Sequence, residues 1–373
     1  MSKSKVLVAM SGGVDSSVAA YLLQEQGHHV RGAMMKLIDD ASVWRGDEQQ
    51  ISDAPRRACC SLADAEDAAQ VARRLGVPFH VFNFSEDFKR EVIGHFIASY
   101  KSGRTPNPCI ECNRILKFSK FLRRAKELEC SHMATGHYAI IEKSPGGRLL
   151  LRRSADMSKD QTYVLYAMTQ DQLAFTLFPL GGLTKEDVRQ IASEQGFDNA
   201  AKLDSQDICF VPDGDYGSYI DEATAEPSQP GPIVDKQGAM IGNHKGFIHY
   251  TIGQRVRLGG LPAPLYVAGI MPETNTIIAA PSADLFTKKL TASNINLISF
   301  DKFDGRLKVQ AKLRYAHRPA RATIWQTGSE SVSIEFDESQ RAITPGQAVV
   351  FYDDDYVVGG GTIDFGVHIF PSS

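Results

Sequence analysis

Near the start of this 373-residue chain the sequence reads Val6-Leu7-Val8-Ala9-Met10-Ser11-Gly12-Gly13-Val14-Asp15-Ser16-Ser17. Its first residues form an apolar run without polar alternation, which is typical of a parallel strand buried on both faces. Val14, Val18 and Leu22 then recur at helical spacing. The paired glycines between strand and helix can adopt backbone angles closed to other residues, so that consecutive N–H groups can face an anion at the helix N-terminus. The stretch therefore predicts a phosphate-binding site.

The glycine loop differs from two common nucleotide-binding loops. A Walker A motif has a lysine directly after its last glycine, and the dipeptide Gly-Lys does not occur in the sequence. The stretch also lacks a Rossmann Gly-x-Gly-x-x-Gly. Ser11-Gly12-Gly13-Val14-Asp15-Ser16 resembles instead the pyrophosphate loop of the PP-loop ATPases, which cleave ATP between the α and β phosphates to adenylate an oxygen. A glycine turn with a Ser/Asp helix cap is the alternative.

Length and composition predict an ordinary globular protein of two or three domains, with 43% hydrophobic residues to form cores. No apolar run approaches the roughly 18 residues of a membrane span, and the N-terminus enters a strand without a signal-peptide pattern, so we expect a cytoplasmic protein without a membrane partner. Six cysteines are too few for a disulfide framework and are expected to be thiols, ligands or catalysts. The net charge of −3 does not indicate nucleic-acid binding, so an RNA site requires local clustering of cations.

Strand and helix patterns alternate through the first half of the chain. They predict strands over residues 29–37, 77–84 and 132–137 and helices over 61–75, 88–103, 115–128 and 184–195. The polar stretch 38–60 is too long for a plain connection and is predicted to be a flap. The third of these strands ends in Ala134-Thr135-Gly136-His137, at the sheet edge where doubly wound folds bind ligands.

Two segments between these elements are expected to belong to a site. The segment 103–113 contains Pro106 and Pro108, which predict a stiff, non-helical loop that holds Cys109 and Cys112. The segment 204–210 carries Cys209, near the predicted end of the first domain.

Glycine and proline become frequent from about residue 214, and helical periodicity disappears. Short hairpins are predicted over 231–258, with turns at Gln237-Gly238 and Gly242-Asn243. Strands predicted over 307–315, 321–326, 332–336, 348–352 and 357–364 have the spacing of a small antiparallel barrel. These patterns divide the chain into domains over 1–213, 214–283 and 284–373.

The first predicted barrel strand has a basic face. Apolar residues from Leu307 to Tyr315 alternate with Lys308, Gln310, Lys312 and Arg314, and further cations follow at Arg318 and Arg321. This face could bind phosphates, although a merely solvated strand face is the alternative.

Several motifs together resemble one family, that of the tRNA-specific 2-thiouridylases (MnmA family) within the PP-loop superfamily. They lie in the family's order and span all three predicted domains: Ser11-Gly12-Gly13-Val14-Asp15-Ser16, the segment 103–112, Ala134-Thr135-Gly136-His137, Lys159-Asp160-Gln161, the segment 204–210, Tyr250-Thr251-Ile252-Gly253-Gln254-Arg255 and Thr344-Pro345-Gly346-Gln347.

The resemblance implies a parallel-sheet α/β PP-loop catalytic domain that binds ATP, a small central β-rich domain and a C-terminal β-barrel that binds tRNA. It implies a transferase that uses ATP and Mg²⁺ to adenylate the C2 carbonyl oxygen of the wobble uridine, position 34, in tRNA. Sulfur from a cysteine persulfide then replaces that oxygen. The implied partners are the Lys, Glu and Gln isoacceptor tRNAs and a sulfur donor such as a cysteine desulfurase or a sulfur relay protein. Because a uracil oxygen is a poor leaving group, adenylation divides one difficult displacement into two easier ones.

The resemblance also implies the site residues. Cys209 receives the persulfide as a catalytic residue, and Cys112 attacks it to release the sulfur or forms a transient disulfide with Cys209. The ATP site comprises Ala9, Met10, Ser11, Gly12, Gly13, Val14, Asp15, Ser16, Met35 and Gly136. The tRNA-binding positions are Asn107, Pro108, Cys109, His137, Lys159, Asp160, Gln161, Arg314, Tyr315 and Gln347, of which Asn107-Pro108-Cys109 faces the target base.

Two positions depart from the family pattern. Some members have Asp where this chain has Cys109, so Cys109, Cys112 and Cys209 could instead hold an iron–sulfur cluster, which is the alternative to the persulfide relay. A closed zinc site is less favoured because it needs a fourth ligand. Arg257 replaces a Gly of the family pattern in a local turn. Cys59, Cys60 and Cys130 are interpreted as structural or incidental.

Two other functions compete with this hypothesis. Another PP-loop adenylating enzyme, such as an amide-nitrogen transferring synthetase, would keep the loop but would not need a cysteine pair. A non-catalytic nucleotide-sensing RNA-binding protein would use the barrel alone to bind RNA.

Overall fold

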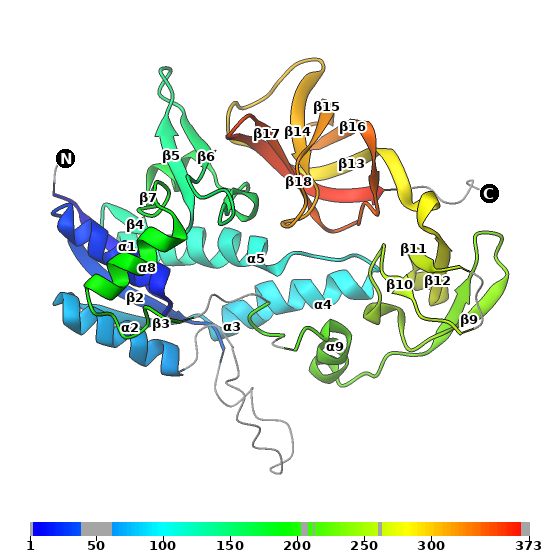
Figure 1. The fold of residues 1–373 in the computed structure, drawn as a ribbon, viewed down its shortest axis with the longest axis horizontal. Helices are drawn as coiled ribbons and strands as arrows, with labels where there is room; N and C mark the ends of the chain where they lie inside the picture. The colour runs from blue at the N-terminus through cyan, green and yellow to red at the C-terminus, as the bar shows by residue number, and fades with distance from the viewer. Residues whose placement is uncertain (1–2, 39–61, 203–207, 212, 260–262, 367–373) are drawn as a thin grey trace, which may run out of the picture. The chain divides into compact units, whose positions relative to one another are not determined.

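The computed structural model of the chain describes residues 3–38, 62–202, 208–211, 213–259 and 263–366 (Figure 1). Its residues form two compact units. The first comprises 1–93, 109–212 and 355–357, and the second comprises 94–108, 213–354 and 358–373. Each unit is described by itself below.

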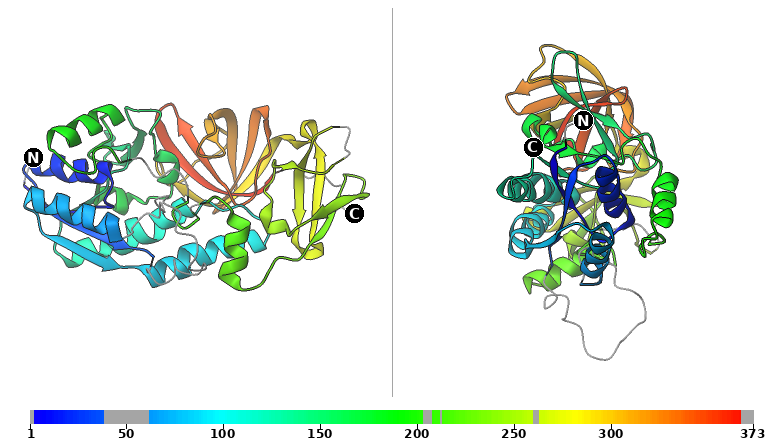
Figure 2. Two further views of the ribbon diagram at one scale, coloured as in Figure 1. Left: turned by 60° about the horizontal axis from the view of Figure 1, so that its bottom comes forward. Right: turned by 90° about the vertical axis from the view of Figure 1, so that its left-hand side faces the viewer.

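A five-stranded parallel sheet is the centre of the first unit. Its order is β3-β2-β1-β4-β7, formed by Phe79–Asn83, His29–Lys36, Lys5–Ala9, His132–Ala134 and Thr176–Leu177. Val6, Leu7 and Val8 of β1 are fully buried. The reason is that β1 lies between β2 and β4 and that helices pack against both faces of the sheet (Figure 2). The predicted parallel α/β fold is confirmed.

Three helices of this unit position the phosphate loop. Helix α1 (Val14–Glu25) follows the loop directly, and its buried residues share one core with those of α2 (Leu62–Leu75) and α8 (Lys185–Glu194). Helix α8 begins at the N-cap Thr184, whose side chain and that of Asp187 form a reciprocal capping box. The predicted flap at 38–60 lies outside the described residues except for Ile38, and the predicted cap Ser61 lies outside them too.

The helical segment that carries Cys109 and Cys112 differs from the sequence prediction. Helix α5 runs over Pro108–Glu111 and continues directly into η3 (Cys112–Phe121, π-helical) and α6 (Leu122–Glu127). The predicted non-helical loop is therefore wrong for these two cysteines, which belong to a helix. Proline is favoured at the first helical position because its missing N–H is not needed there, and Pro108 starts the helix. Upstream, α3 (Ser85–Asp87), η2 (Phe88–Ile93) and α4 (Gly94–Lys101) confirm the other predicted helix.

A hairpin that the sequence did not predict completes the first unit. It is formed by β5 (Ala139–Lys143) and β6 (Leu149–Arg153), and Arg152 pairs with Tyr356. Two short helices follow it, η4 (Thr162–Val164) and α7 (Gln170–Ala174).

The second unit contains a small β module. Its strand order is β10-β11-β12-β8-β9, from Arg255–Val256, Leu265–Met271, Thr276–Pro281, Gly231–Val234 and Met240–His244. Helix α9 (Tyr216–Thr224) and the short helices η5 (Phe247–His249) and η6 (Pro272–Thr274) accompany it. The turn at Gln237-Gly238 is confirmed, with φ of 85° at Gly238. The turn at Gly242-Asn243 is wrong, because both residues pair within β9, and a Cβ on Gly242 would lie 2.6 Å from Leu258.

A six-stranded antiparallel barrel forms the rest of the second unit, except that the first residues of β18 belong to the first. Its order is β13-β16-β15-β14-β17-β18, and β13 pairs with β18 to close it. The strands are β13 Phe286–Leu297, β14 Leu307–Lys312, β15 Ala320–Gly328, β16 Ser331–Arg341, β17 Ala348–Asp353 and β18 Tyr356–Gly366, with η7 (Ser282–Leu285) before them. Five of these were predicted and β13 was missed. The predicted β-barrel is confirmed.

Candidate active site

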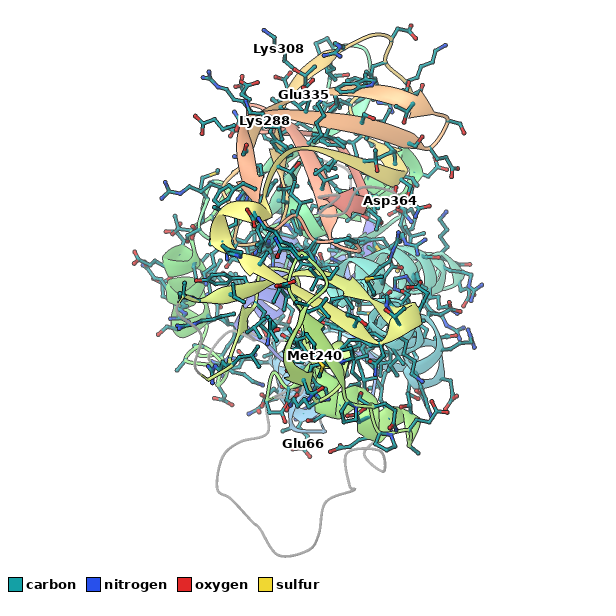
Figure 3. The ribbon with its side chains drawn as sticks, turned by 90° about the vertical axis from the view of Figure 1, so that its right-hand side faces the viewer. Glu66, Met240, Lys288, Lys308, Glu335 and Asp364 are labelled. Atoms are coloured by element: carbon teal, nitrogen blue, oxygen red, sulfur yellow. The ribbon has the colours of Figure 1, made fainter. Side chains whose placement is uncertain are left out.

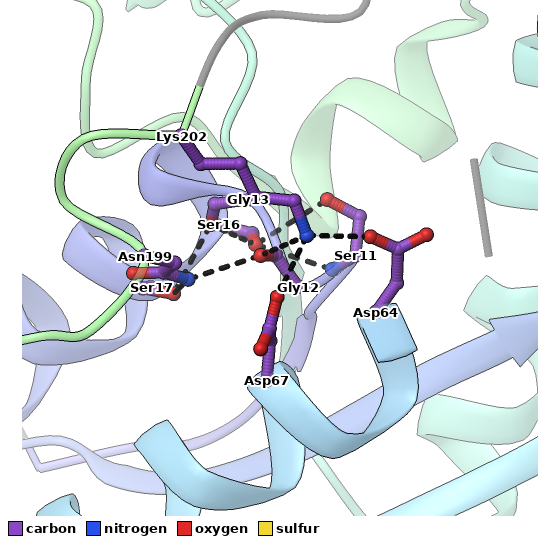
Figure 4. A network of polar contacts seen from close by, with 9 residues as sticks. All are labelled: Ser11, Gly12, Gly13, Ser16, Ser17, Asp64, Asp67, Asn199 and Lys202. Atoms are coloured by element: carbon purple, nitrogen blue, oxygen red, sulfur yellow. Dashed lines mark hydrogen bonds and ion pairs between the residues drawn. The ribbon is translucent and has the colours of Figure 1, made fainter. Parts of the chain in front are cut away.

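The phosphate loop has the backbone geometry that anion binding requires. Gly12 has φ of 75°, and Gly13 is the extended N-cap of α1 (Figure 4). The first N–H groups of a helix have no acceptor within the helix, so those of α1 lie at the loop with the positive end of the helix dipole. The loop can therefore bind the phosphates of a nucleotide.

The loop serines stabilise this backbone. The hydroxyls of Ser16 and Ser17 are buried, and each donates to the Gly13 carbonyl at 3.0 Å. The Ser16 hydroxyl also accepts from the Ser11 N–H at 3.1 Å. Ser11 itself is exposed. Ser16 and Ser17 thus preform the loop, whereas Ser11 is placed to meet a ligand.

Gly12 lies at the closest point between the loop and α2. A Cβ on this residue would lie 2.3 Å from the carbonyl oxygen of Asp64, which no side chain tolerates. The Gly12 carbonyl accepts from Asn199 at 3.0 Å and from the Lys202 ammonium at 3.4 Å (Figure 4). Residues more than 180 positions away in sequence therefore fix the conformation of Gly12.

Lys202 is also the centre of an ion-pair network. Its Nζ lies 2.6 Å from Asp64 and 2.7 Å from Asp67 (Figure 4). Burial by itself would lower the pKa of Lys202, but hydrogen bonds and charge attraction from the two carboxylates outweigh it, so the pKa is raised. Lys202 consequently brings a permanent positive charge to a loop that lacks a Walker lysine.

Asp15 pairs with a lysine of α8. Lys185 is nearly buried, and its Nζ lies 2.7 and 2.8 Å from the two carboxylate oxygens of Asp15. The Tyr138 hydroxyl donates to the same carboxylate at 2.8 Å. Asp15 therefore connects the first turn of α1 to α8 and to the chain after β4.

The remaining predicted ATP-site residues surround the loop. Ala9 ends β1 and Met10 follows it, Met35 lies near the end of the adjacent β2, and all three are buried. Gly136 follows β4, where a Cβ would lie 2.9 Å from the backbone of Asp15 and Ser16. The structure thus brings the predicted ATP-site residues together at the carboxyl edge of the sheet, where open α/β sheets bind their ligands.

His137 lies behind this edge in an apolar environment. Its ring packs near Phe118 and Phe178, and the Thr135 hydroxyl lies 2.7 Å from Nδ1. Burial, followed by the nearby positive charge of Lys117, holds the pKa of His137 well below its usual range. His137 is therefore neutral at physiological pH.

The cysteines lie on elements anchored by buried neighbours. Cys109 is exposed and Cys112 is partly buried, and the next side chain, Asn113, donates to the Val164 carbonyl at 2.9 Å. Cys209 is partly buried in a short turn whose next residue, Phe210, packs edge-on against Phe88 at 5.6 Å. All three cysteines are thiols of the first unit.

These cysteines are not grouped as metal ligands. Within the described part of the chain, which includes Cys109, Cys112 and Cys209, no three His, Cys, Asp or Glu side chains are placed to hold a metal ion.

Predicted tRNA-binding residues of the first unit have internal hydrogen bonds. Asp160 is buried and accepts from the Thr162 hydroxyl at 2.8 Å, while Gln161 accepts from the Tyr138 N–H at 2.9 Å. The backbone N–H of Lys159, which is partly exposed, donates to the Asp156 carbonyl. The side chains of Asp160 and Gln161 thus stabilise the conformation of this segment.

The predicted tRNA-binding residues of the barrel differ in their surroundings. Arg314 donates to the carbonyls of Arg341 and Ala342 at 3.1 and 2.7 Å, and Gln347 donates to those of Thr105 and Pro106. The predicted strand 307–315 is too long, because β14 ends at Lys312, and Tyr315, which the alternation placed on the apolar face, is 45% exposed. Its ring faces outward, with the Lys312 ammonium 5.4 Å from the centroid.

An acidic residue of β16, Glu335, lies among cations of the barrel surface. Lys308 and Glu335 lie on the outer surface (Figure 3), and Glu335 pairs with Lys289 at 3.5 Å and Arg306 at 3.7 Å. Val309, Ala311 and Leu313 are buried, which confirms the predicted alternation. The face thus carries an excess of positive charge.

Sequence reasoning missed the residues that hold the loop from a distance, namely Tyr138, Lys185, Asn199 and Lys202. Lys202 lies two residues before the motif 204–210, but a single sequence carries no signal for its contact with Gly12 across 190 residues.

Breaking the Asp15–Lys185 pair should destabilise the first unit. In Asp15→Ala, Lys185 loses the carboxylate that compensates its burial, so we expect a loss of about 3 kcal/mol in unfolding free energy, at the low end for buried pairs because Asp15 is partly exposed. Lys185→Met combined with Asp15→Asn should recover most of this loss. Urea titration of the three proteins measures it, and equal stability of the single and double variants would contradict the assignment.

His137 should make stability fall in mild acid. Its folded pKa lies below the unfolded value of about 6.5, so the unfolded chain binds more protons below pH 6.5 and stability decreases as pH falls, by about 1.4 kcal/mol per pH unit. His137→Gln should reduce this slope between pH 6.5 and 5.5 in urea titrations. The control is His29→Gln at an exposed position of β2. An unchanged slope in His137→Gln would show that the histidine is protonated in the fold.

Comparisons with known proteins agree with this geometry. Residues 4–213, 219–281 and 287–363 match the families described as tRNA methyl transferase HUP domain, tRNA methyl transferase PRC-barrel domain and Aminomethyltransferase beta-barrel domain. A 4-thiouridine synthetase solved with RNA and ATP is 16% identical, with a TM-score of 0.35 over 56% of this chain and 46% of that one, which is too distant to bear on function.

Two curated relatives match along almost their whole length. The tRNA-specific 2-thiouridylase MnmA of Clostridium perfringens is 50% identical over 98% of this chain and 99% of its own. That of Symbiobacterium thermophilum is 50% identical over 96% and 92%. With the phosphate loop and both cysteines in place, this similarity shows that the chain belongs to the tRNA-specific 2-thiouridylase family.

Proposed function

We propose that this chain is an ATP-dependent tRNA-uridine 2-sulfurtransferase that thiolates the wobble uridine, position 34. The observation that carries this function is 50% identity to tRNA-specific 2-thiouridylases over 98% of the chain. The phosphate loop and the two anchored cysteines support it, because adenylation requires the first and sulfur transfer the second.

The adenylation step uses the phosphate loop. The C2 oxygen of uridine attacks the α-phosphorus of ATP, and the bond to the β-phosphate oxygen breaks, so that pyrophosphate leaves. The N–H groups at Gly12, Gly13 and the start of α1 stabilise the developing charge. We assign ATP to Ala9, Met10, Ser11, Gly12, Gly13, Val14, Asp15, Ser16, Met35 and Gly136. No protein ligand is assigned to Mg²⁺, which would accompany the ATP phosphates, because Lys185 already pairs with the Asp15 carboxylate.

The sulfur step uses Cys112 and Cys209. Cys209 receives a persulfide from a donor protein, such as a cysteine desulfurase or a sulfur relay protein. The terminal sulfur bonds to C2 of the uracil, AMP leaves, and the Cys112 thiolate attacks the Cys209 sulfur. The products are 2-thiouridine and a Cys112–Cys209 disulfide, which an external thiol reduces. The ungrouped cysteines disfavour the iron–sulfur alternative.

The partners and organisation follow from the same family. We propose tRNAs of the Lys, Glu and Gln isoacceptors as substrates, domains over 1–213, 214–283 and 284–373, and a cytoplasmic location. Among the described helices, none combines the length and the apolar character needed to span a bilayer. The exposed Tyr315 beside Lys312 offers a stacking and phosphate-binding surface for RNA.

Sulfur transfer and adenylation should separate by mutation. Cys112→Ser and Cys209→Ser should each abolish ATP-dependent 2-thiouridine formation, measured by mass spectrometry of tRNA nucleosides, while tRNA-dependent pyrophosphate release continues. Cys109→Ser should retain thiolation at a reduced rate, because its thiol is not on the sulfur path.

Two results would contradict this function. If pyrophosphate release does not depend on tRNA, another adenylating enzyme is favoured. If no pyrophosphate is released at all, a nucleotide-sensing RNA-binding protein is favoured. Stoichiometric iron in anaerobically purified protein, lost in Cys109→Ser, would replace the relay with a cluster.

Lys202 should contribute to ATP binding. We expect its ammonium to exchange Asp64 and Asp67 for ATP phosphate, so that Lys202→Met raises the KM for ATP at least about tenfold, the loss of one charge-assisted hydrogen bond. The comparison is Asp64→Asn combined with Asp67→Asn, which leaves the ammonium available and should not raise this KM. An equal rise in both proteins would assign the network to stability alone.

A further inference from the structure

The segment that leads into the Cys109–Cys112 helix is bound to the barrel. The Thr105 N–H donates to the Pro345 carbonyl at 2.9 Å. In return, the Gln347 side-chain amide donates to the carbonyls of Thr105 at 2.9 Å and Pro106 at 3.3 Å. These residues all belong to the second unit. One turn of the barrel, Thr344 to Gln347, therefore bonds both polar backbone groups of Thr105.

The barrel turn approaches the segment so closely that position 346 requires glycine. Gly346 has φ of 89°, and a Cβ there would lie 3.0 Å from both the Thr105 nitrogen and the Arg104 Cβ. The turn is itself fixed on β18, because the Gly346 N–H donates to the Ile363 carbonyl at 2.9 Å and the Ile363 N–H donates to the Gln347 carbonyl at 2.8 Å. The barrel thus presents a rigid surface to the segment.

The other end of the segment is equally restricted. Gly103 has φ of 72°, and a Cβ there would lie 2.8 Å from Pro272 of the small β module. Arg104 also pairs with Asp364 at 3.6 Å. The segment is therefore fixed where it begins as well as along the barrel turn.

The connection from this contact to the cysteines is short and stiff. Pro106 and Pro108 are buried and have restricted φ, and α5 begins at Pro108. Cys109 and Cys112 follow on that continuous helix. A displacement at Thr105 is consequently passed to the start of the helix instead of being absorbed by a flexible loop.

We propose that Gln347 is a positioning residue for sulfur transfer, which acts by holding Thr105 and Pro106 and thereby the start of the helix that carries Cys112. This role rests on the proposed function and differs from direct contact with tRNA. Positioning matters because displacing a reacting group by about 1 Å can cost about a hundredfold in rate.

The test separates positioning from RNA contact. Gln347→Leu keeps the size of the side chain but removes both hydrogen bonds, so the single-turnover rate of sulfur transfer should fall about tenfold. The rate is measured at saturating tRNA, so that a change in tRNA affinity does not contribute to it, and the dissociation constant for tRNA is measured separately. Gln326→Leu, the same change on β15 of the same barrel, is the matched control and should leave both values unchanged. Weaker tRNA affinity with unchanged sulfur transfer at saturating tRNA in Gln347→Leu would overturn the proposal.

A second variant and a structural readout complete the test. Gly346→Ala adds no group that recognises RNA but strains the turn at φ of 89°, and it should also slow sulfur transfer. Both variants should increase amide hydrogen exchange over residues 105–116, and unchanged exchange would overturn the proposal. If the unsubstituted protein does not thiolate tRNA, the proposed function has failed, whereas the exchange measurement still tests the contact.

Discussion

The close approach of three remote segments at Gly12 is the constraint on which the nucleotide site depends. The carbonyl of Asp64 occupies the space of a Cβ at Gly12, and the Gly12 carbonyl accepts from Asn199 and Lys202. These contacts use the carbonyl group of Gly12, so the N–H groups of the loop are left to bind a ligand. The loop is therefore preorganised only after α2 and the segment after α8 have packed, so that nucleotide binding and the stability of the first unit are coupled.

Elements whose signal is local could be predicted from the sequence. The buried β1, the glycine loop and α1 followed from an apolar run, two glycines and helical spacing, and α8 was predicted over residues 184–195. The partners of these elements could not be predicted. Asp15 meets Lys185 across 170 residues, and no propensity or period encodes such a pair.

Local rules also gave wrong answers where tertiary context changed their meaning. Pro108 suggested a break, yet proline at the first position starts a helix. Gly242 suggested a turn, yet it is a strand residue that leaves room for Leu258. Strand β13 was missed because its register shifts between Thr287 and Lys289 and again in its pairing with β18, which interrupts the alternation of apolar residues. A single sequence cannot show which of two permitted roles such a residue has.

Several residues that the family resemblance assigns to tRNA binding make hydrogen bonds within the protein itself, so they support the fold of their segments. Asp160, Arg314 and Gln347 each bond to neighbouring groups of the fold, whereas Tyr315 remains exposed beside Lys312. Lys289 and Arg306 of the barrel likewise pair with Glu335, so under the proposed function an RNA phosphate would compete with that carboxylate for them. Under the proposed function these residues have two roles: internally bonded side chains hold the segments in place, and a smaller set of exposed side chains is left to bind the RNA. A chain with a net charge of −3 can therefore bind a polyanion, because such binding depends on the position of a few cations on a rigid surface and not on their total number.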